Sequence, residues 1–178
     1  MPIPTGIDIA ERLTIRPERP DDTDAIHAVL TSAFGPVDPC VPRIVDDLRS
    51  NDRLTHALVA SLGGVLVGFA AASRVWIKHV DAELLGIAPI AVVPAFQRQG
   101  IGTALMQQLL DVCRTSQAIA AVVLGDPAYY GRFGFRPADT LDLRCTFTDG
   151  AAFQAMPLID GGLDGVQGLV EYDACFDA

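Results

Sequence analysis

The spacing of apolar residues in the first part of the chain predicts a short strand followed by two helices. Residues 13–17 read as a strand that stops at a proline. An aspartate pair at 21–22 is a helix N-cap signal, and apolar residues then recur at helical spacing over 25–33. This pattern predicts an amphipathic helix that ends near Gly35. A second short helix is expected over residues 43–50.

The middle of the chain has the composition and period of strands. Two apolar runs, over residues 56–62 and 65–77, are separated by Gly63 and Gly64. Two glycines between such runs indicate a hairpin, because the tight turns that join paired strands need positive φ angles. A further apolar run covers residues 84–93 and ends at a proline.

The second half of the chain predicts a strand–helix–strand unit and two returning strands. Apolar residues over 101–112 have helical spacing, and residues 119–124 read as a fully buried strand. Residues 140–147 and 168–176 are expected to form two further strands. These elements together predict a mixed α/β (α+β) fold, with helices packed on a central sheet.

Composition narrows the class of protein. Half of the 178 residues are hydrophobic, which is typical of a globular chain. The net charge of −9 argues against a nucleic-acid partner, since phosphate contacts need clustered Lys and Arg. The four cysteines lie too far apart for a zinc framework or a disulfide scaffold and are expected to be free thiols: Cys40, Cys113, Cys145 and Cys175.

The apolar stretches do not predict a membrane protein. The longest of them is interrupted by prolines and is shorter than the roughly 20 residues that a spanning helix needs. Asp8 and Glu11 stand where a signal peptide would need positive charge and an apolar core. We therefore expect no membrane partner and a cytoplasmic location.

The turn between residues 92 and 105 carries the most specific chemistry. It joins a buried strand, a proline, a loop with two glycines and a helix start. A helix start presents unpartnered N–H groups and positive partial charge, and glycines let an anion approach the backbone. A phosphate or pyrophosphate site at residues 98–103 is one interpretation, with Arg98 adding charge. A tight turn that merely tolerates glycine is the other.

Two common phosphate motifs fit this turn poorly. The chain has no Gly-Lys-Ser/Thr of a Walker A loop. The dinucleotide fingerprint fails because Leu105 replaces its third glycine. The acidic ribose contact expected about 20 residues on is also missing, since position 122 is Val and no acidic residue lies near it before Asp126. A nucleotide-dependent oxidoreductase therefore stays a minor alternative.

At this turn the sequence resembles the GNAT N-acetyltransferases. Residues 97–102 read Q-x-x-G-x-G after an I-A-V-x-P strand, which is similar to the acetyl-CoA-binding motif of that family. Residues 130–135 match its Y-x-x-x-G-F segment, and LGDPAYYGRFGF is close to its YhbS-like branch of predicted acetyltransferases. The resemblance covers residues 13–137 strongly and 138–178 loosely. It implies one domain over residues 1–178, with a mostly antiparallel sheet that is splayed at the acetyl-CoA site.

The resemblance also implies a cofactor site without a metal. Acetyl-CoA is the expected co-substrate, with its pyrophosphate on the amides of the turn and its pantetheine arm along the preceding strand. The amide of Val92 is expected to polarise the thioester carbonyl. The implied cofactor-binding residues are Ile90, Ala91, Val92, Gln97, Arg98, Gln99, Gly100, Ile101, Gly102 and Thr103.

Two residues are candidates for the catalytic groups. Tyr130 matches the general acid of the family, which protonates the departing sulfur; the alternative is a packing role in its aromatic cluster. Glu83 is the candidate general base, and the alternative is a solvated acid at a strand end. His56 and His79 could also serve as the base.

The function implied is direct transfer of an acetyl group to a primary amine of a small molecule or peptide. The negative charge mildly favours a cationic acceptor such as a polyamine or an aminoglycoside. The alternative is a non-catalytic CoA-binding sensor or partner module. Homodimers are common in the family, so a homodimer is a further expectation by analogy.

Overall fold

The computed structural model describes residues 12–148 and 150–177. Its strands are β1 (Leu13–Pro17), β2 (Leu54–Leu62), β3 (Val65–Ile77), β4 (Leu84–Val92), β5 (Ala120–Leu124), β6 (Arg136–Pro137), β7 (Leu143–Cys145), β8 (Phe153–Pro157) and β9 (Gly168–Glu171). Its α-helices are α2 (Thr23–Phe34), α3 (Val41–Ser50), α4 (Ile101–Arg114) and α5 (Pro127–Tyr130). Short 3-10 turns at Pro20–Asp22, Pro94–Phe96, Gly131–Phe133, Ala138–Leu141 and Ala174–Asp177 complete the described elements.

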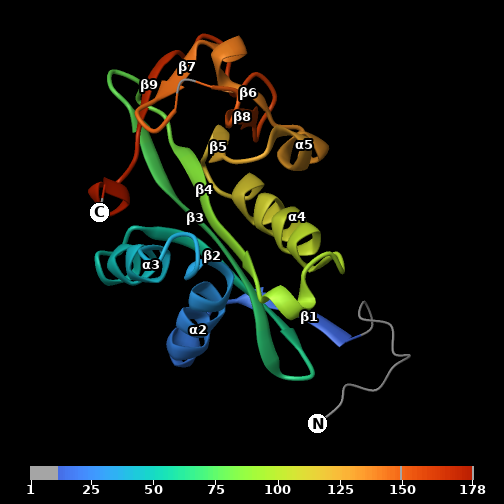
Figure 1. The fold of residues 1–178 in the computed structure, drawn as a ribbon. Helices are drawn as coiled ribbons and strands as arrows, with labels where there is room; N and C mark the ends of the chain where they lie inside the picture. Colours follow the sequence, from blue (N-terminus) through green and yellow to red (C-terminus); the bar gives the residue numbers. More distant parts are fainter. Residues whose placement is uncertain (1–11, 149, 178) are drawn as a thin grey trace.

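The strands form one mixed sheet with helices on both faces (Figure 1). The strand order is β1-β2-β3-β4-β5-β8-β6, and β9 pairs with both β3 and β7. All pairs in the main order are antiparallel except β4 with β5. Helix α4 packs on one face, and α2 and α3 pack on the other. The expected mostly antiparallel sheet flanked by helices is confirmed.

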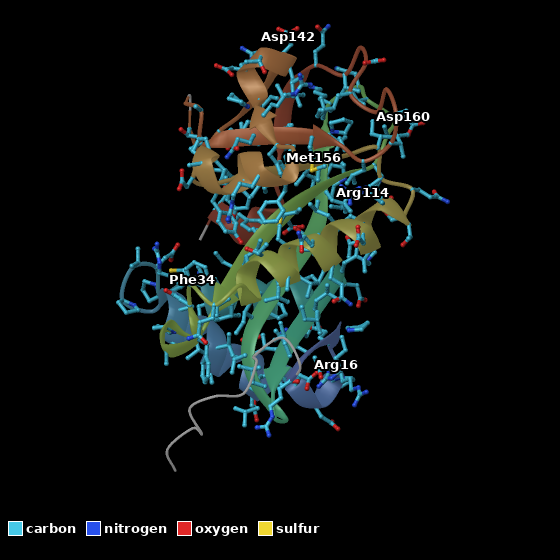
Figure 2. The ribbon with its side chains drawn as sticks, turned by 90° about the vertical axis from the view of Figure 1, so that its right-hand side faces the viewer. Arg16, Phe34, Arg114, Asp142, Met156 and Asp160 are labelled. Atoms are coloured by element: carbon cyan, nitrogen blue, oxygen red, sulfur yellow. The ribbon has the colours of Figure 1, made fainter. Side chains whose placement is uncertain are left out.

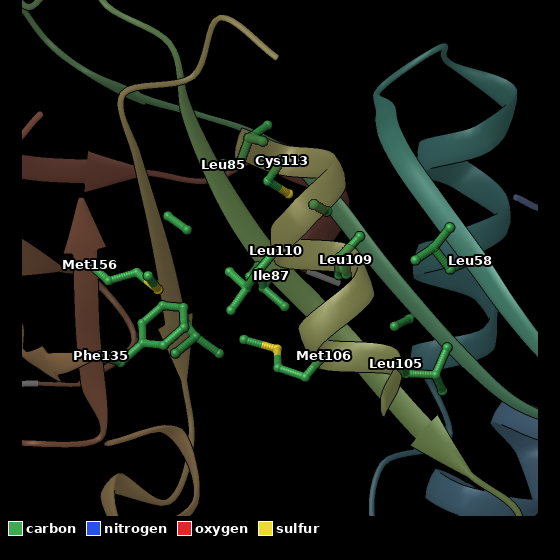
Figure 3. Packing of buried hydrophobic residues seen from close by; sticks show 14 of the residues in the cluster. Leu58, Leu85, Ile87, Leu105, Met106, Leu109, Leu110, Cys113, Phe135 and Met156 are labelled. Carbon is green, nitrogen blue, oxygen red and sulfur yellow. The ribbon is translucent and has the colours of Figure 1, made fainter. Parts of the chain in front are cut away.

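Helix α4 packs on the sheet because its apolar residues repeat every three or four positions. Its buried side chains are Ile101, Leu105, Met106, Leu109, Leu110 and Cys113. Figure 3 shows five of them facing the strands, with Phe135 and Met156 on the adjoining side of the same cluster. Burial raises the pKa of the Cys113 thiol to about 12, as expected for a core cysteine.

Strands β4 and β5 are paired over only part of the length of β4. Their parallel register runs from Leu84 opposite Ala120 to Ile87 opposite Val123. Beyond Ile87, β4 continues to Val92 paired with β3 alone, after a register shift that accommodates Pro89. The strands therefore part in the middle of the sheet, which is the splay that the resemblance implied.

Most of the predicted elements in the first two thirds of the chain are confirmed. Gly63 and Gly64 form the hairpin turn with φ angles of 57° and 87°. The first helix is capped at Gly35, as its pattern indicated. The second helix begins at Val41, two residues earlier than predicted. Proline at its second position explains the difference, since proline fits the first turn of a helix.

The predicted strands of the C-terminal part are wrong in their extents. Residues 140–147 contain the end of a 3-10 turn and the three-residue strand β7, and residues 168–176 contain β9 and the start of another 3-10 turn. Strand β8, which pairs with β5, was not predicted. Its residues Phe153 to Met156 are buried on both faces, so they show no alternation, and alanine and glutamine are weak strand formers.

The aspartate pair at 21–22 acts differently from the predicted cap. Asp22 occupies the N-cap position of α2, but its side chain makes no cap hydrogen bond there. Its carboxylate instead accepts hydrogen bonds from the Arg16 guanidinium at 2.6 and 2.9 Å and from the Arg19 N–H at 2.8 Å. Arg16 lies on β1 and is labelled at the lower end of the molecule in Figure 2. The pair therefore ties the first strand to the start of the first helix.

The Asp22–Arg16 pair should make stability depend on acidity. The hydrogen bonds from Arg16 hold the pKa of Asp22 at about 2, below its usual 3.8. The contribution of the ionised Asp22 to the free energy of unfolding is therefore fully present above pH 4. It is lost as the pH falls toward 2 and the carboxylate becomes protonated. We expect Asp22→Asn to lower the free energy of unfolding by about 1 kcal/mol at pH 7 and by much less at pH 2.5. Urea unfolding at both pH values checks this, with the exposed Asp21→Asn as a control that should change little.

In the described part of the chain, no helix is long and apolar enough to cross a bilayer. The signal-peptide argument rests on Asp8 and Glu11, which lie outside the described residues.

Candidate functional site

The turn between β4 and α4 presents a row of free backbone N–H groups. Arg98 and Gly100 have positive φ angles of 61° and 85°, and α4 begins directly after them at Ile101. Within residues 12–148 and 150–177, the amides of residues 98–103 donate no hydrogen bond. Successive amides in such a turn, at the positive end of a helix, form a concave anion site. The geometry fits the pyrophosphate site that the sequence indicated.

The two glycines of the turn are needed for different reasons. At Gly100 a β-carbon would meet no other atom, so only its positive φ favours glycine. At Gly102 a β-carbon would lie 3.3 Å from the Tyr129 hydroxyl and 3.6 Å from a methyl group of Val92. Glycine at this second position keeps the space above the helix start open for a ligand.

Gln97 fixes the turn to the end of β4. Its side-chain amide donates a 2.9 Å hydrogen bond to the carbonyl of Val92. This bond also shows which way Val92 faces, since the carbonyl and the amide of one strand residue point to the same side. The Val93 amide donates to Val67 on β3, so the amides of Ile90 and Val92 point to the opposite side, where β5 has already ended. Ala91, by contrast, pairs with Phe69 of β3.

A cavity of about 600 Å³ lies over these amides. Its walls come from the end of β4, the turn, the start of α4 and α5. The lining residues are Ile90, Val92, Gln97, Arg98, Gly100, Gly102, Thr103, Tyr129, Tyr130 and Arg132. The structure thus brings most of the predicted cofactor-binding residues and the predicted acid to one cavity.

Two residues that line this cavity, Tyr129 and Arg132, were not predicted as site residues. The Arg132 guanidinium lies 4.6 Å from the centre of the Tyr129 ring, and its Nε donates to the Tyr129 carbonyl at 3.2 Å. Arg98 and Arg132 give the cavity two cations in an acidic protein, which suits a polyphosphate ligand. The signal in the sequence is the arginine at position 132, within the aromatic segment that contains the predicted acid Tyr130.

Tyr130 stands at the end of α5, where its ring is fixed by neighbours. It makes edge-to-face contacts with Tyr129 and Phe135, at centroid distances of 4.9 and 6.0 Å. Asp126 caps the helix by accepting a hydrogen bond from the Ala128 N–H at 2.9 Å. Burial raises the pKa of Tyr130 to about 12, so its hydroxyl is protonated at neutral pH and can donate a hydrogen bond.

Gly125 determines where the Tyr130 ring can lie. A β-carbon at residue 125 would overlap the ring, and the Gly125 backbone is held by hydrogen bonds with Ala152 and the buried Gln154. We expect Gly125→Ala to push the ring aside. It should lower kcat for the acetyl transfer that the sequence resemblance implies about tenfold, with much less effect on the affinity for acetyl-CoA. Gly131→Ala is the matched control, since a β-carbon there meets no other atom. Equal kcat values for the two variants would contradict the positioning role of Gly125.

A second cavity of about 430 Å³ adjoins the first. Ile90 and Tyr130 line both cavities, so they lie at the junction. The second cavity is lined by α2, α3 and the loop between them, by the middle of β4 and the end of β5, and by Phe147, Tyr172 and Phe176 from the C-terminal part of the chain. This arrangement leaves room for a second molecule beside the first, with Tyr130 between them.

The candidate bases are not brought to Tyr130. Glu83 precedes β4, and the seven residues from it to Ile90 span roughly 23 Å of extended chain. His56 lies half-buried on β2, where burial lowers its pKa, and His79 lies in the turn after β3 with a φ of 70°. None of the three lines either cavity. The described residues also contain no cluster of three or more side chains that could hold a metal ion.

Comparisons with known proteins agree with this geometry. The sequence profile described as "Acetyltransferase (GNAT) family" matches residues 23–135. The chain is 39% identical to the uncharacterized N-acetyltransferase YhbS of Escherichia coli K12 over 167 residues, which covers 93% of this chain and 99% of that protein.

Two solved structures are similar over nearly the whole chain. YhbS from Escherichia coli in complex with CoA has a TM-score of 0.89 at 38% identity, covering 94% of this chain and 93% of its own. A GNAT family acetyltransferase from Brucella melitensis in complex with acetyl-CoA has a TM-score of 0.79 at 37% identity, covering 93% of this chain and 98% of its own.

Proposed function

Because the chain belongs to the acetyltransferase (GNAT) family, we propose that it transfers the acetyl group of acetyl-CoA directly to a primary amine. The observation that carries the proposal is the junction of the two cavities at Tyr130. One cavity has the free amides and the two arginines for a polyphosphate cofactor, and the other has room for an acceptor. Two relatives of known structure hold CoA or acetyl-CoA.

The backbone of the turn and of β4 binds and orients the cofactor. The amides of residues 98–103 receive the pyrophosphate, and Arg98 and Arg132 supply positive charge to the phosphates. Bound acetyl-CoA would supply an activated acetyl group as a thioester. The Val92 amide, which lies next to the turn and lines the cofactor cavity alone, would bond the pantetheine arm. The Ile90 amide, at the junction of the two cavities, would polarise the thioester carbonyl in the manner of an oxyanion hole, in place of the Val92 amide that the sequence predicted.

Tyr130 acts on the sulfur through a hydrogen bond. Its pKa of about 12 exceeds that of an ordinary thiol, about 8.5, so complete transfer of its proton costs about 5 kcal/mol. Tyr130 therefore stabilises the departing sulfur as a donor and keeps its proton at the end of the reaction. In the overall transfer, an N–C bond forms and the C–S bond breaks. The acceptor ammonium loses two protons, one to solvent and one to the thiol.

Several sequence predictions accompany this proposal. Ala91 as a cofactor contact and Glu83 as the general base stay predictions, and the position of Glu83 argues against direct contact with the acceptor. A single domain over residues 1–178, a cytoplasmic location and a homodimer also stay predictions.

The melting temperature with and without acetyl-CoA tests the cofactor part of the proposal. A ligand at 100 times its Kd stabilises by about 2.7 kcal/mol, which is a shift of about 5 to 10 °C for a chain of this size. NADH is the control and should cause no shift. No shift with millimolar acetyl-CoA would overturn the proposal. A shift without turnover of any amine would favour the non-catalytic CoA-binding module.

A further inference from the structure

We propose that the acceptor is a small monoamine with an apolar body, aromatic by preference, bound in the second cavity. This inference rests on the proposed acetyl transfer and names the class of acceptor. It differs from the polyamine or aminoglycoside that the net charge of the chain favoured, because the wall of the cavity is a local property.

The wall of the second cavity is mostly apolar. It combines Phe34 and Val45 from the α2–α3 side, Leu124 from the end of β5, and Phe147 and Phe176 from the C-terminal extension. Covering such a wall with an apolar body is favourable, because it removes apolar surface from water. It offers few hydrogen-bond partners for the hydroxyl and amino groups of a sugar.

The aromatic side chains of the wall are arranged to receive another ring. Tyr172 makes edge-to-face contacts with Phe147 and with Phe176, at centroid distances of 5.4 and 5.5 Å. Phe147 is nevertheless 44% exposed, although it is large and apolar. Aromatic pairs in this geometry are favourable beyond the burial of area alone. An acceptor ring next to Phe147 would cover this exposed surface.

The cavity can balance only one positive charge. Among the described residues that line it, Asp38 is the only charged side chain. One of its oxygens accepts a hydrogen bond from the Cys40 N–H at 3.1 Å, which leaves the other free for an ammonium group. With the reacting nitrogen toward Tyr130, the second ammonium of a short diamine would lie with the apolar body, toward Phe147 and Phe176. There it would lose its hydration beside apolar side chains, which is unfavourable.

The size of the cavity also selects a small molecule. Its volume of about 430 Å³ lies in the lower part of the 300–1,000 Å³ range that is usual for small ligands. Since Ile90 and Tyr130 border both cavities, the amine end lies toward them and the apolar body lies toward Phe147 and Phe176.

Three matched amines test the class of acceptor. Pentylamine and 1,4-diaminobutane have the same number of non-hydrogen atoms and differ in one charge, and 2-phenylethylamine adds the ring. We expect kcat/KM, measured by release of the CoA thiol, to be at least about 100-fold higher for pentylamine than for 1,4-diaminobutane. It should be about tenfold higher again for 2-phenylethylamine. A preference for 1,4-diaminobutane, or equal values for the three amines, would overturn the inference.

A pair of variants locates the effect in the cavity. Phe147→Ala should lower kcat/KM for 2-phenylethylamine about tenfold and for pentylamine by less. Leu169→Ala is the matched control, since Leu169 is 40% exposed on β9 and does not line the cavity. Equal effects of the two variants on 2-phenylethylamine would contradict the proposed position of the ring.

Binding measurements separate this inference from the proposed function. Calorimetry with 2-phenylethylamine, in the presence of CoA, reports the second cavity without any turnover. If acetyl-CoA shifts the melting temperature but 2-phenylethylamine neither binds nor reacts, the inference fails and the cofactor site stands. If acetyl-CoA itself does not bind, the proposed function fails, and the inference fails with it.

Discussion

Replacing Tyr130 by phenylalanine should lower kcat about 100-fold and leave the stabilisation by acetyl-CoA nearly unchanged. The substitution keeps the ring and its contacts with Tyr129 and Phe135 but removes the hydroxyl that we propose donates a hydrogen bond to sulfur. Loss of one positioned donor to charge that develops in the transition state costs about 10²- to 10³-fold, and the lower value applies because a thiolate leaves readily without help. The measurements are single-turnover rates with the best amine of the panel and melting temperatures with acetyl-CoA.

This substitution distinguishes chemistry from packing at residue 130. If Tyr130 only packed in the aromatic cluster, phenylalanine would fill the same space and kcat would not change. The pH dependence adds a second check. With a pKa of about 12, Tyr130 stays protonated up to at least pH 10, so its titration should not lower the wild-type rate between pH 7 and 10.

Replacing Gly102 by valine should weaken the binding of acetyl-CoA more than about 100-fold. The new side chain would occupy the space between the start of α4, Tyr129 and Val92, where the cavity needs open backbone. Hydrogen bonds to charged groups contribute about 1.5 to 3 kcal/mol each, so the loss of two at the pyrophosphate is enough for this effect. Calorimetric titration with CoA measures the change directly.

Ala104→Val is the matched control for Gly102→Val. It places the same β-branched side chain two residues further along α4, at a position that does not line the cofactor cavity. The control accounts for the cost of valine in a helix, which is a few tenths of a kcal/mol. If both variants bind CoA equally well, the turn at residues 98–103 does not hold the cofactor.

The sequence predicted the parts of the fold that depend on local pattern. The hairpin at Gly63 and Gly64, the helix α4 and the Q-x-x-G-x-G turn each have a period or a turn residue that identifies them. Strand β8 has no such signal, because it is short and buried on both faces. Its place next to β5 depends on pairing with a strand about 30 residues earlier in the chain, which local periodicity does not contain.

The candidate site divides in the same way. The turn with free amides is contiguous in sequence, so its motif could be recognised from the sequence, and its contacts with the cofactor stay predictions. The second cavity could not be predicted in this way, because Phe34, Phe147 and Phe176 in its wall come from distant parts of the chain. Glu83, the predicted base, is a different case. It immediately precedes β4, seven residues from Ile90, and residue spacing alone does not tell which end of a strand faces the chemistry.

The parting of β4 and β5 has a consequence for how the protein can be observed. Two amide protons in the middle of a sheet, those of Ile90 and Val92, face away from their one strand partner. They should exchange with solvent deuterium much faster than the amide of Ala91 between them, which is paired with β3. Bound CoA should slow the exchange of both amide protons. The exchange rates of these two amides would therefore report whether the cofactor cavity is occupied, and the measurement needs no acceptor.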